Sequence, residues 1–193
     1  MRIASNGQTT AQVPRPTQPK GQTLSPPAIS VAALQFGIPA YKNFFVVERE
    51  NEEKAARELW RYIDSLSEDD VIYHYGSYEK TKANRLKEKY GLPEATLEKF
   101  DRLRVDLYRV VEQCSDWPLS SYGVKSIAKH LGFKWTSEDA SGANSIAWFQ
   151  EYQSNPANKE LFEKILTYNR EDCEAMIVVK DYLVKNSQPM TDG

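Results

Sequence analysis

Acidic residues are missing from the front of this 193-residue chain, where no Asp or Glu precedes Glu48. The same segment holds four basic residues and so carries a charge of +4. From position 48 onward, 21 basic residues stand against 27 acidic ones. The net charge of −2 provides no global basic surface, which disfavours binding of nucleic acid driven mainly by charge. A local basic groove is still compatible with this charge.

Cysteine and long apolar runs are also scarce. Cys114 and Cys173 are too few and too far apart in sequence to indicate a disulfide framework or a zinc site. No stretch approaches the roughly 18 apolar residues of a spanning helix, and the N-terminus lacks the apolar core of a signal peptide. We therefore expect a soluble protein of the reducing cytoplasm with no membrane partner, in which Cys173 is a small buried residue.

Composition divides the chain into three parts. Residues 1–28 are rich in Gln, Thr, Ser, Gly and Pro, and the prolines are spaced so that neither a helix nor a central strand can form. We predict a disordered tail there. Residues 29–186 have the length of one folded domain, and 187–193 are predicted to be a flexible C-terminus.

Hydrophobic periodicity predicts an α/β domain. Two short apolar runs, 29–36 and 44–47, are separated by Gly and Pro and predict a hairpin. The run 71–75 predicts a short buried strand. Helical stripes predict helices over 52–66, about 78–90, 121–131, 147–152 and 159–184. Early strands, late helices and one strand that leads into a helix favour a sheet flanked by helices.

A tyrosine and an aspartate four residues apart form the first candidate site. Tyr168 and Asp172 would share one face of the last predicted helix, because residues at i and i+4 are neighbours on a helix surface. Two-metal nucleases need several carboxylates around Mg²⁺ or Mn²⁺, which prefer oxygen ligands. Asp172 and Glu79 would be such ligands, and Tyr168 would orient the attacking water. Alternatively, Tyr168 only packs on a core face with an acid at its edge.

The junction after the predicted strand 71–75 holds the second candidate group. Glu79 would be a metal ligand, or would only favour the dipole of the helix that it begins. His74 would contact nucleic acid, or would be a hydrogen-bonded histidine at the strand end. Asp106 lies in an apolar run and would be an unusual charge to bury without a metal or partner. Its alternative role is the N-cap of a helix starting at Leu107.

Basic and aromatic residues around 74–90 suggest a nucleic-acid contact. Lysines there would follow a phosphate backbone, with tyrosines available for stacking on bases. A solvated helix face is the alternative. The candidate contacts are His74, Tyr75, Tyr78, Lys80, Lys82 and Lys125.

Taken in order, several segments resemble one family. They are His74–Glu79, Arg104–Leu107, Ser121–Ile127 with Leu131–Phe133, and Tyr168–Ala175. The ordered set resembles the ribonuclease H-like domain found at the C-terminus of RecB-family nucleases, a relative of the DEDD 3′–5′ exonucleases in their tyrosine subclass. The resemblance runs from Phe44 to Leu183.

The resemblance implies a mixed sheet flanked by helices, with the first three strands antiparallel. It also implies four carboxylates on two Mg²⁺ or Mn²⁺ ions that hydrolyse phosphodiester bonds at a single-stranded DNA or RNA end. Glu79 would be the acid of the second motif, and Asp172 with Tyr168 would form the third. Asp106 matches a recurrent family acid and is a further candidate metal ligand.

The family's first motif, Asp-x-Glu on the opening strand, has no counterpart ahead of Glu48. We expect either a piece of a longer protein with a nuclease or helicase domain, or a module that lacks the opening strand and half of its metal ligands. Losing two of four carboxylates should abolish tight binding of both metals. The alternative function is therefore a degenerate module that binds nucleic acid or a protein without cleaving.

Overall fold

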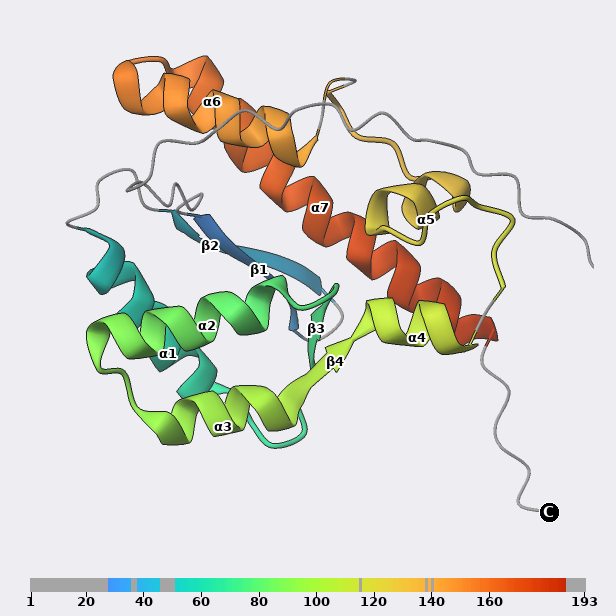
Figure 1. Cartoon of the computed structure of the whole chain (residues 1–193), viewed down its shortest axis with the longest axis horizontal. Coiled ribbons are helices and arrows are strands. Elements are labelled where there is room, and N and C mark those ends of the chain that lie inside the picture. The colour runs from blue at the N-terminus through green and yellow to red at the C-terminus, as the bar shows by residue number, and fades with distance from the viewer. Residues whose placement is uncertain are drawn as a thin grey trace, which may run out of the picture.

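The structure, a computed structural model, describes residues 28–35, 38–45, 51–114, 116–137, 139 and 141–186. Residues 1–27 of the predicted tail and the predicted C-terminal segment 187–193 lie outside this part, so both remain predictions. The elements, drawn in Figure 1, are β1 (Ala28–Gln35), β2 (Ile38–Phe45), α1 (Glu52–Ser65), β3 (Ile72–His74), α2 (Tyr78–Tyr90), α3 (Glu94–Leu103), β4 (Arg104–Asp106), α4 (Leu107–Cys114), α5 (Val124–His130), α6 (Gly142–Ser154) and α7 (Lys159–Asn186).

The described strands form two separate two-stranded sheets. β1 and β2 pair antiparallel as the predicted hairpin, with Gln35 opposite Ile38. The predicted start of the second strand is wrong, because β2 begins at Ile38 and includes Pro39. β3 and β4 pair in parallel. The α/β class is therefore confirmed, whereas the described residues do not join in the one mixed sheet that the resemblance implied.

The predicted helices are present with adjusted bounds. Gly91 ends α2 in the left-handed conformation (φ +57°), where glycine carries no side-chain penalty. α6 is longer than predicted, since Ser141 caps it by accepting a hydrogen bond from the backbone N–H of Asn144 at 3.1 Å. No helix of the described ranges is both long and apolar enough to cross a membrane.

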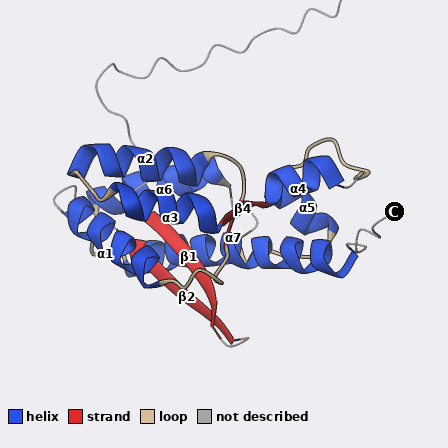
Figure 2. Cartoon of the chain, turned by 90° about the horizontal axis from the view of Figure 1, so that it is seen from below, coloured by secondary structure: helices blue, strands red, loops and turns tan. Residues whose placement is uncertain are grey.

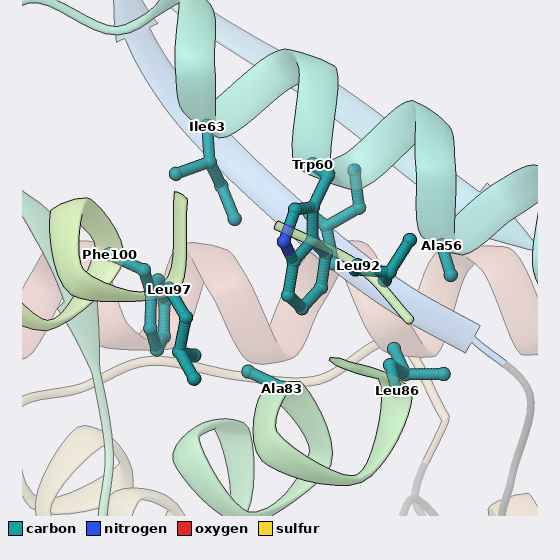
Figure 3. Packing of buried hydrophobic residues seen from close by; sticks show 9 residues of the cluster. Ala56, Trp60, Ile63, Ala83, Leu86, Leu92, Leu97 and Phe100 are labelled. Carbon is teal, nitrogen blue, oxygen red and sulfur yellow. The ribbon is translucent and has the colours of Figure 1, made fainter. Parts of the chain in front are cut away.

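Helix α3 is an element that the periodicity analysis missed. It follows Pro93 directly, and its buried residues Leu97, Phe100 and Leu103 are spaced three apart. With α1 and α2 it forms one part of the core, shown in Figure 3, where Trp60 lies among the aliphatic side chains. The indole Nε1 of Trp60 donates to the carbonyl oxygen of Pro93 at 3.2 Å, so the polar atom of this buried ring is satisfied.

Helix α7 links the other two parts of the core. Its first half packs against α6 through Leu161 and Ile165, and its second half packs in a cluster with α4 and α5 through Ala175 and Val179. Its backbone also lies along β1, while α1 lies along β2. Figures 1 and 2 show α1–α3 toward one end of the molecule and α4 and α5 toward the other. Asp172, the candidate acid, lies in the turn of α7 between these two apolar halves.

His74, the last residue of β3, joins that strand to Arg104 at the start of β4. It is 2% exposed. Its Nδ1 lies 2.7 Å from the carbonyl oxygen of Gly76, and its Nε2 lies 3.3 Å from Nη1 of Arg104. A carbonyl can only accept and a guanidinium can only donate, so this arrangement fixes the neutral ring with its proton on Nδ1. Burial lowers the pKa of His74.

The packing of α5 on α7 gives a first prediction. Ile127 is 0% exposed in the cluster shared by these helices. We expect Ile127→Ala to lower the free energy of unfolding by about 2–5 kcal/mol, because it leaves a cavity. Urea unfolding measures this value. Ile146→Ala, in a residue that is 38% exposed on α6, is the matched control and should change it by no more than about 0.5 kcal/mol. Equal losses in both variants would contradict the assignment of Ile127 to the core.

The buried His74 gives a second prediction. Its folded-state pKa lies below the unfolded value of about 6.5, so the unfolded chain binds the proton more readily. The associated stability is present above about pH 6.5 and is lost as the pH falls through that value toward the folded-state pKa. We expect the urea midpoint to fall on acidification over this window. His74→Gln should remove this part of the pH dependence, and His130→Gln, on an exposed residue, should keep it.

Candidate functional site

Asp172 lies at the centre of a small polar cluster on α7. The indole Nε1 of Trp135 donates to its Oδ1 at 2.9 Å, and Nζ of Lys125 lies 4.0 Å from the same oxygen. The hydroxyl of Tyr168, one helical turn earlier, hydrogen-bonds to the Asp172 carboxylate. Side chains from α5 and from the segment that follows it therefore converge on this acid of α7, and the predicted pair Tyr168–Asp172 does share one face of its helix.

Burial governs the charge states of this cluster. It raises the pKa of Asp172, while the nearby ammonium of Lys125 and the hydrogen bonds from Trp135 and Tyr168 act in the opposite direction. Burial also raises the pKa of Tyr168, and the charge of Asp172 raises it further. The Tyr168 hydroxyl therefore stays protonated at neutral pH and can both donate and accept a hydrogen bond.

The ring of Tyr168 is enclosed. Tyr168 is 5% exposed, with Nζ of Lys125 at 4.4 Å from its ring centroid and the ring of Trp148 packed edge-on at 5.9 Å. Lys125 also lies 5.4 Å from the ring of Trp135. One ammonium group thus contacts two aromatic faces and a carboxylate, an arrangement in which cation–π attraction and the ion pair act together.

Glu171 and Trp135 are residues of this cluster that the sequence analysis did not identify. Glu171 is 6% exposed, and its Oε1 accepts hydrogen bonds from both the backbone N–H and the hydroxyl of Thr136. These bonds fasten the segment that carries Trp135 to α7. The only sequence signal for Glu171 is its place three residues after Tyr168. Trp135 has no local signal, because its partner lies 37 positions away.

Glu79 belongs to a second group, at the junction of β3 with α2. One of its carboxylate oxygens, Oε2, is buried without a hydrogen bond in the described part of the chain and lies 3.8 Å from Nδ1 of His74. Burial raises the pKa of Glu79, and the negative charge of Asp106 raises it further. The ionised form of this carboxylate is thus less stable here than in water.

Asp106 links the ends of the two parallel strands. Its Oδ1 accepts hydrogen bonds from the backbone N–H of Gly76 at 2.8 Å and of Tyr108 at 3.0 Å. The second bond makes Asp106 the N-cap of α4, the alternative that local sequence had left open. Its Oδ2 lies 4.0 Å from Nε of Arg109. Asp106 therefore has structural partners that account for its partial burial.

The two groups do not combine into a metal centre within the described residues. Carboxylates are the right donors for Mg²⁺ or Mn²⁺. However, no three His, Cys, Asp or Glu side chains of the described ranges gather closely enough to hold a metal ion. Glu79 and Asp106 lie together at the strand ends, whereas Asp172 is engaged by Trp135 and Lys125. The described residues alone do not fit a two-metal centre.

The residues predicted to contact nucleic acid differ in their exposure and in their partners. His74 is buried against Gly76 and Arg104, and the hydroxyl of Tyr75 donates to the carbonyl oxygen of Tyr122. Tyr78 is exposed, with Nζ of Lys82 at 5.4 Å from its ring centroid. Three lysines of α2 form ion pairs, namely Lys80 with Asp101, Lys87 with Glu94 and Lys89 with Glu52. This pairing reduces the charge that α2 offers to a phosphate backbone.

A comparison with known families identifies the superfamily of this chain. A family model described as the RNase H superfamily matches residues 24–184, which include Glu79, Tyr168 and Asp172. The search of curated proteins and the search of solved structures returned no match. Since the matched region extends from the start of β1 almost to the end of α7, the chain belongs to the RNase H superfamily.

Proposed function

We propose that this chain is a nuclease domain of the 3′–5′ exonuclease type, in the tyrosine subclass of the DEDD enzymes. The observation that carries the proposal is the Tyr168–Asp172 pair. The two side chains share one face of α7, hydrogen-bond to each other and lie within the part matched by the RNase H superfamily. RNase H superfamily membership itself points to nuclease-type chemistry, and the tyrosine–aspartate pair points to the subclass.

In the proposed reaction, water attacks the phosphorus of the last phosphodiester bond at a 3′ end. A bond from the water oxygen to phosphorus forms, and the bond to the 3′-oxygen of the preceding nucleotide breaks as that oxygen takes up a proton. The protonated hydroxyl of Tyr168, oriented by Asp172, would position the attacking water. Glu79 would contribute the acid of the second motif, and its half-exposed side chain could reorient from the position at His74.

Divalent ions supply charge stabilisation and water activation in two-metal nucleases. Because the described residues do not assemble the complete donor set, the proposal requires carboxylates from outside them. The chain itself has no acidic residue before Glu48. Acids of this chain that lie outside the described ranges, such as Glu48 and Glu50, would complete the set in the purified protein, and a nuclease or helicase domain of a longer parent chain is the alternative source. The proposed substrate is a single-stranded end of DNA or RNA.

A second function is favoured by one specific observation. Among the described residues, no three potential metal ligands gather. A domain with this arrangement could bind a nucleic-acid strand or a protein without cleaving it. Tyr78 and Lys82, side by side at the start of α2, offer a stacking surface and a charge to such a strand.

Cleavage of a labelled strand separates the two functions. We expect purified protein with Mn²⁺ to shorten a 5′-labelled single strand from its 3′ end. Asp172→Asn should abolish this activity, and Tyr168→Phe should slow it by about 100-fold or more, since it removes the hydroxyl that positions the water. Asp181→Asn and Tyr182→Phe, both on exposed residues of the same helix, are the matched controls and should retain full activity.

The cleaving and the non-cleaving function predict different results in this assay. Shortening that persists in Asp172→Asn would remove Asp172 from the site. No shortening by the parent protein, together with retained binding of the strand in a gel-shift assay, would establish the non-cleaving function instead. Binding that weakens with rising salt would identify the phosphate backbone as the contact.

A further inference from the structure

An ammonium group and a carboxylate share the contact between α5 and α7. Nζ of Lys125 lies 4.0 Å from Oδ1 of Asp172, and the same oxygen accepts the indole N–H of Trp135 at 2.9 Å. One oxygen of the candidate metal ligand is thus engaged by a full positive charge and by a hydrogen-bond donor. This arrangement offers a physical reason why Asp172 does not join a group of acids in the described residues.

The packing of α5 fixes the position of this ammonium group. Lys125 lies in the first turn of α5, two residues before Ile127 and three before Ala128, which are both 0% exposed in the cluster shared with α7. The packed helix fixes the backbone from which Lys125 extends. Tyr168 and Trp135 flank the ammonium group at 4.4 and 5.4 Å from their ring centroids. Two aromatic faces and one carboxylate are the features of a cation site.

We propose that Lys125 is the resident cation of the Asp172 site. It is a positioning residue that balances the Asp172 carboxylate and holds the Tyr168–Asp172 pair in place without a metal, and a divalent ion must displace it to reach Asp172. This inference rests on the proposed function only in taking Asp172 as a residue of the site.

The charge and partial burial of the two side chains support the displacement of Lys125 by a divalent ion. The side chains of Lys125 and Asp172 are 29% and 32% exposed, so their attraction is screened less than that of a fully exposed pair. A divalent ion at Oδ1 would be repelled by the adjacent ammonium group. The remaining exposure and the flexible stem of lysine give Lys125 a path to turn away toward solvent when such an ion arrives.

The test measures thermal unfolding of the full chain in EDTA for a double-mutant cycle. We expect Lys125→Met to lower the melting temperature by several degrees, and Lys125→Arg, which keeps the charge, to lower it less. In an Asp172→Asn background the effect of Lys125→Met should largely vanish, because the charge that it balances is gone. Lys129→Met, on an exposed residue one turn later in α5, is the matched control and should change little. Lys125→Gln repeats the measurement with a polar side chain.

A second readout measures Mn²⁺ binding from the electron paramagnetic resonance signal of the free ion. We expect Lys125→Met to bind Mn²⁺ about tenfold more tightly than the parent protein, since it removes a positive charge beside the ligand oxygen. Lys129→Met should match the parent, and the double variant with Asp172→Asn should lose the gain.

Two results would overturn the inference. One is an equal loss of melting temperature with and without Asp172, which would make Lys125 a packing residue. The other is Mn²⁺ binding that is no tighter in Lys125→Met than in the parent protein, including no binding by either. Neither readout needs cleavage, so a parent protein that fails to degrade a strand defeats the proposed function without deciding this inference.

Discussion

Helix α7 must bury an apolar stripe along both of its halves and still carry two carboxylates in the turn between them. Leu161 and Ile165 are covered by α6, while Ala175 and Val179 are covered from the side of α4 and α5. Between these contacts Glu171 is buried and Asp172 is partly buried, and a buried charge needs partners. Trp135 and Thr136 supply hydrogen bonds to this turn, and Lys125 supplies an opposite charge.

The two carboxylates of that turn have different partners, and one oxygen of Glu171, Oε2, is buried without a hydrogen bond among the described residues. Glu171 faces the connection between α5 and α6, where the backbone N–H and hydroxyl of Thr136 both donate to it. Asp172 receives the indole N–H of Trp135 and the charge of Lys125. Because Trp135 and Thr136 are adjacent, the two acids fix the same short segment from two sides. The polar turn therefore fastens to α7 a loop whose Phe133 and Trp135 also pack against the apolar core.

Much of the helical architecture could be predicted from the sequence, because amphipathic periodicity is a local property. The bounds of α2 were predicted correctly, from a helical pattern that ends at Gly91. The start of β2 was not, because proline is uncommon inside a strand and yet Pro39 lies in β2 opposite Leu34. The spacing of Tyr168 and Asp172 was also sufficient to place both on one face. Trp135 was missed, since its contact with Asp172 depends on how α5 and α7 pack rather than on spacing along the chain.

The β3–β4 junction shows how structural and candidate functional roles compete for the same acids. Asp106 accepts two backbone N–H groups and so holds the end of β3 near the start of α4. A carboxylate oxygen engaged in this way has fewer lone pairs to offer a metal ion. Glu79 differs, because its buried Oε2 has no hydrogen bond in the described part of the chain and lies close to another negative charge. A buried unpaired carboxylate oxygen is destabilising. Of the two acids at this junction, Glu79 is therefore the one whose position the fold alone leaves unexplained and a bound cation would stabilise.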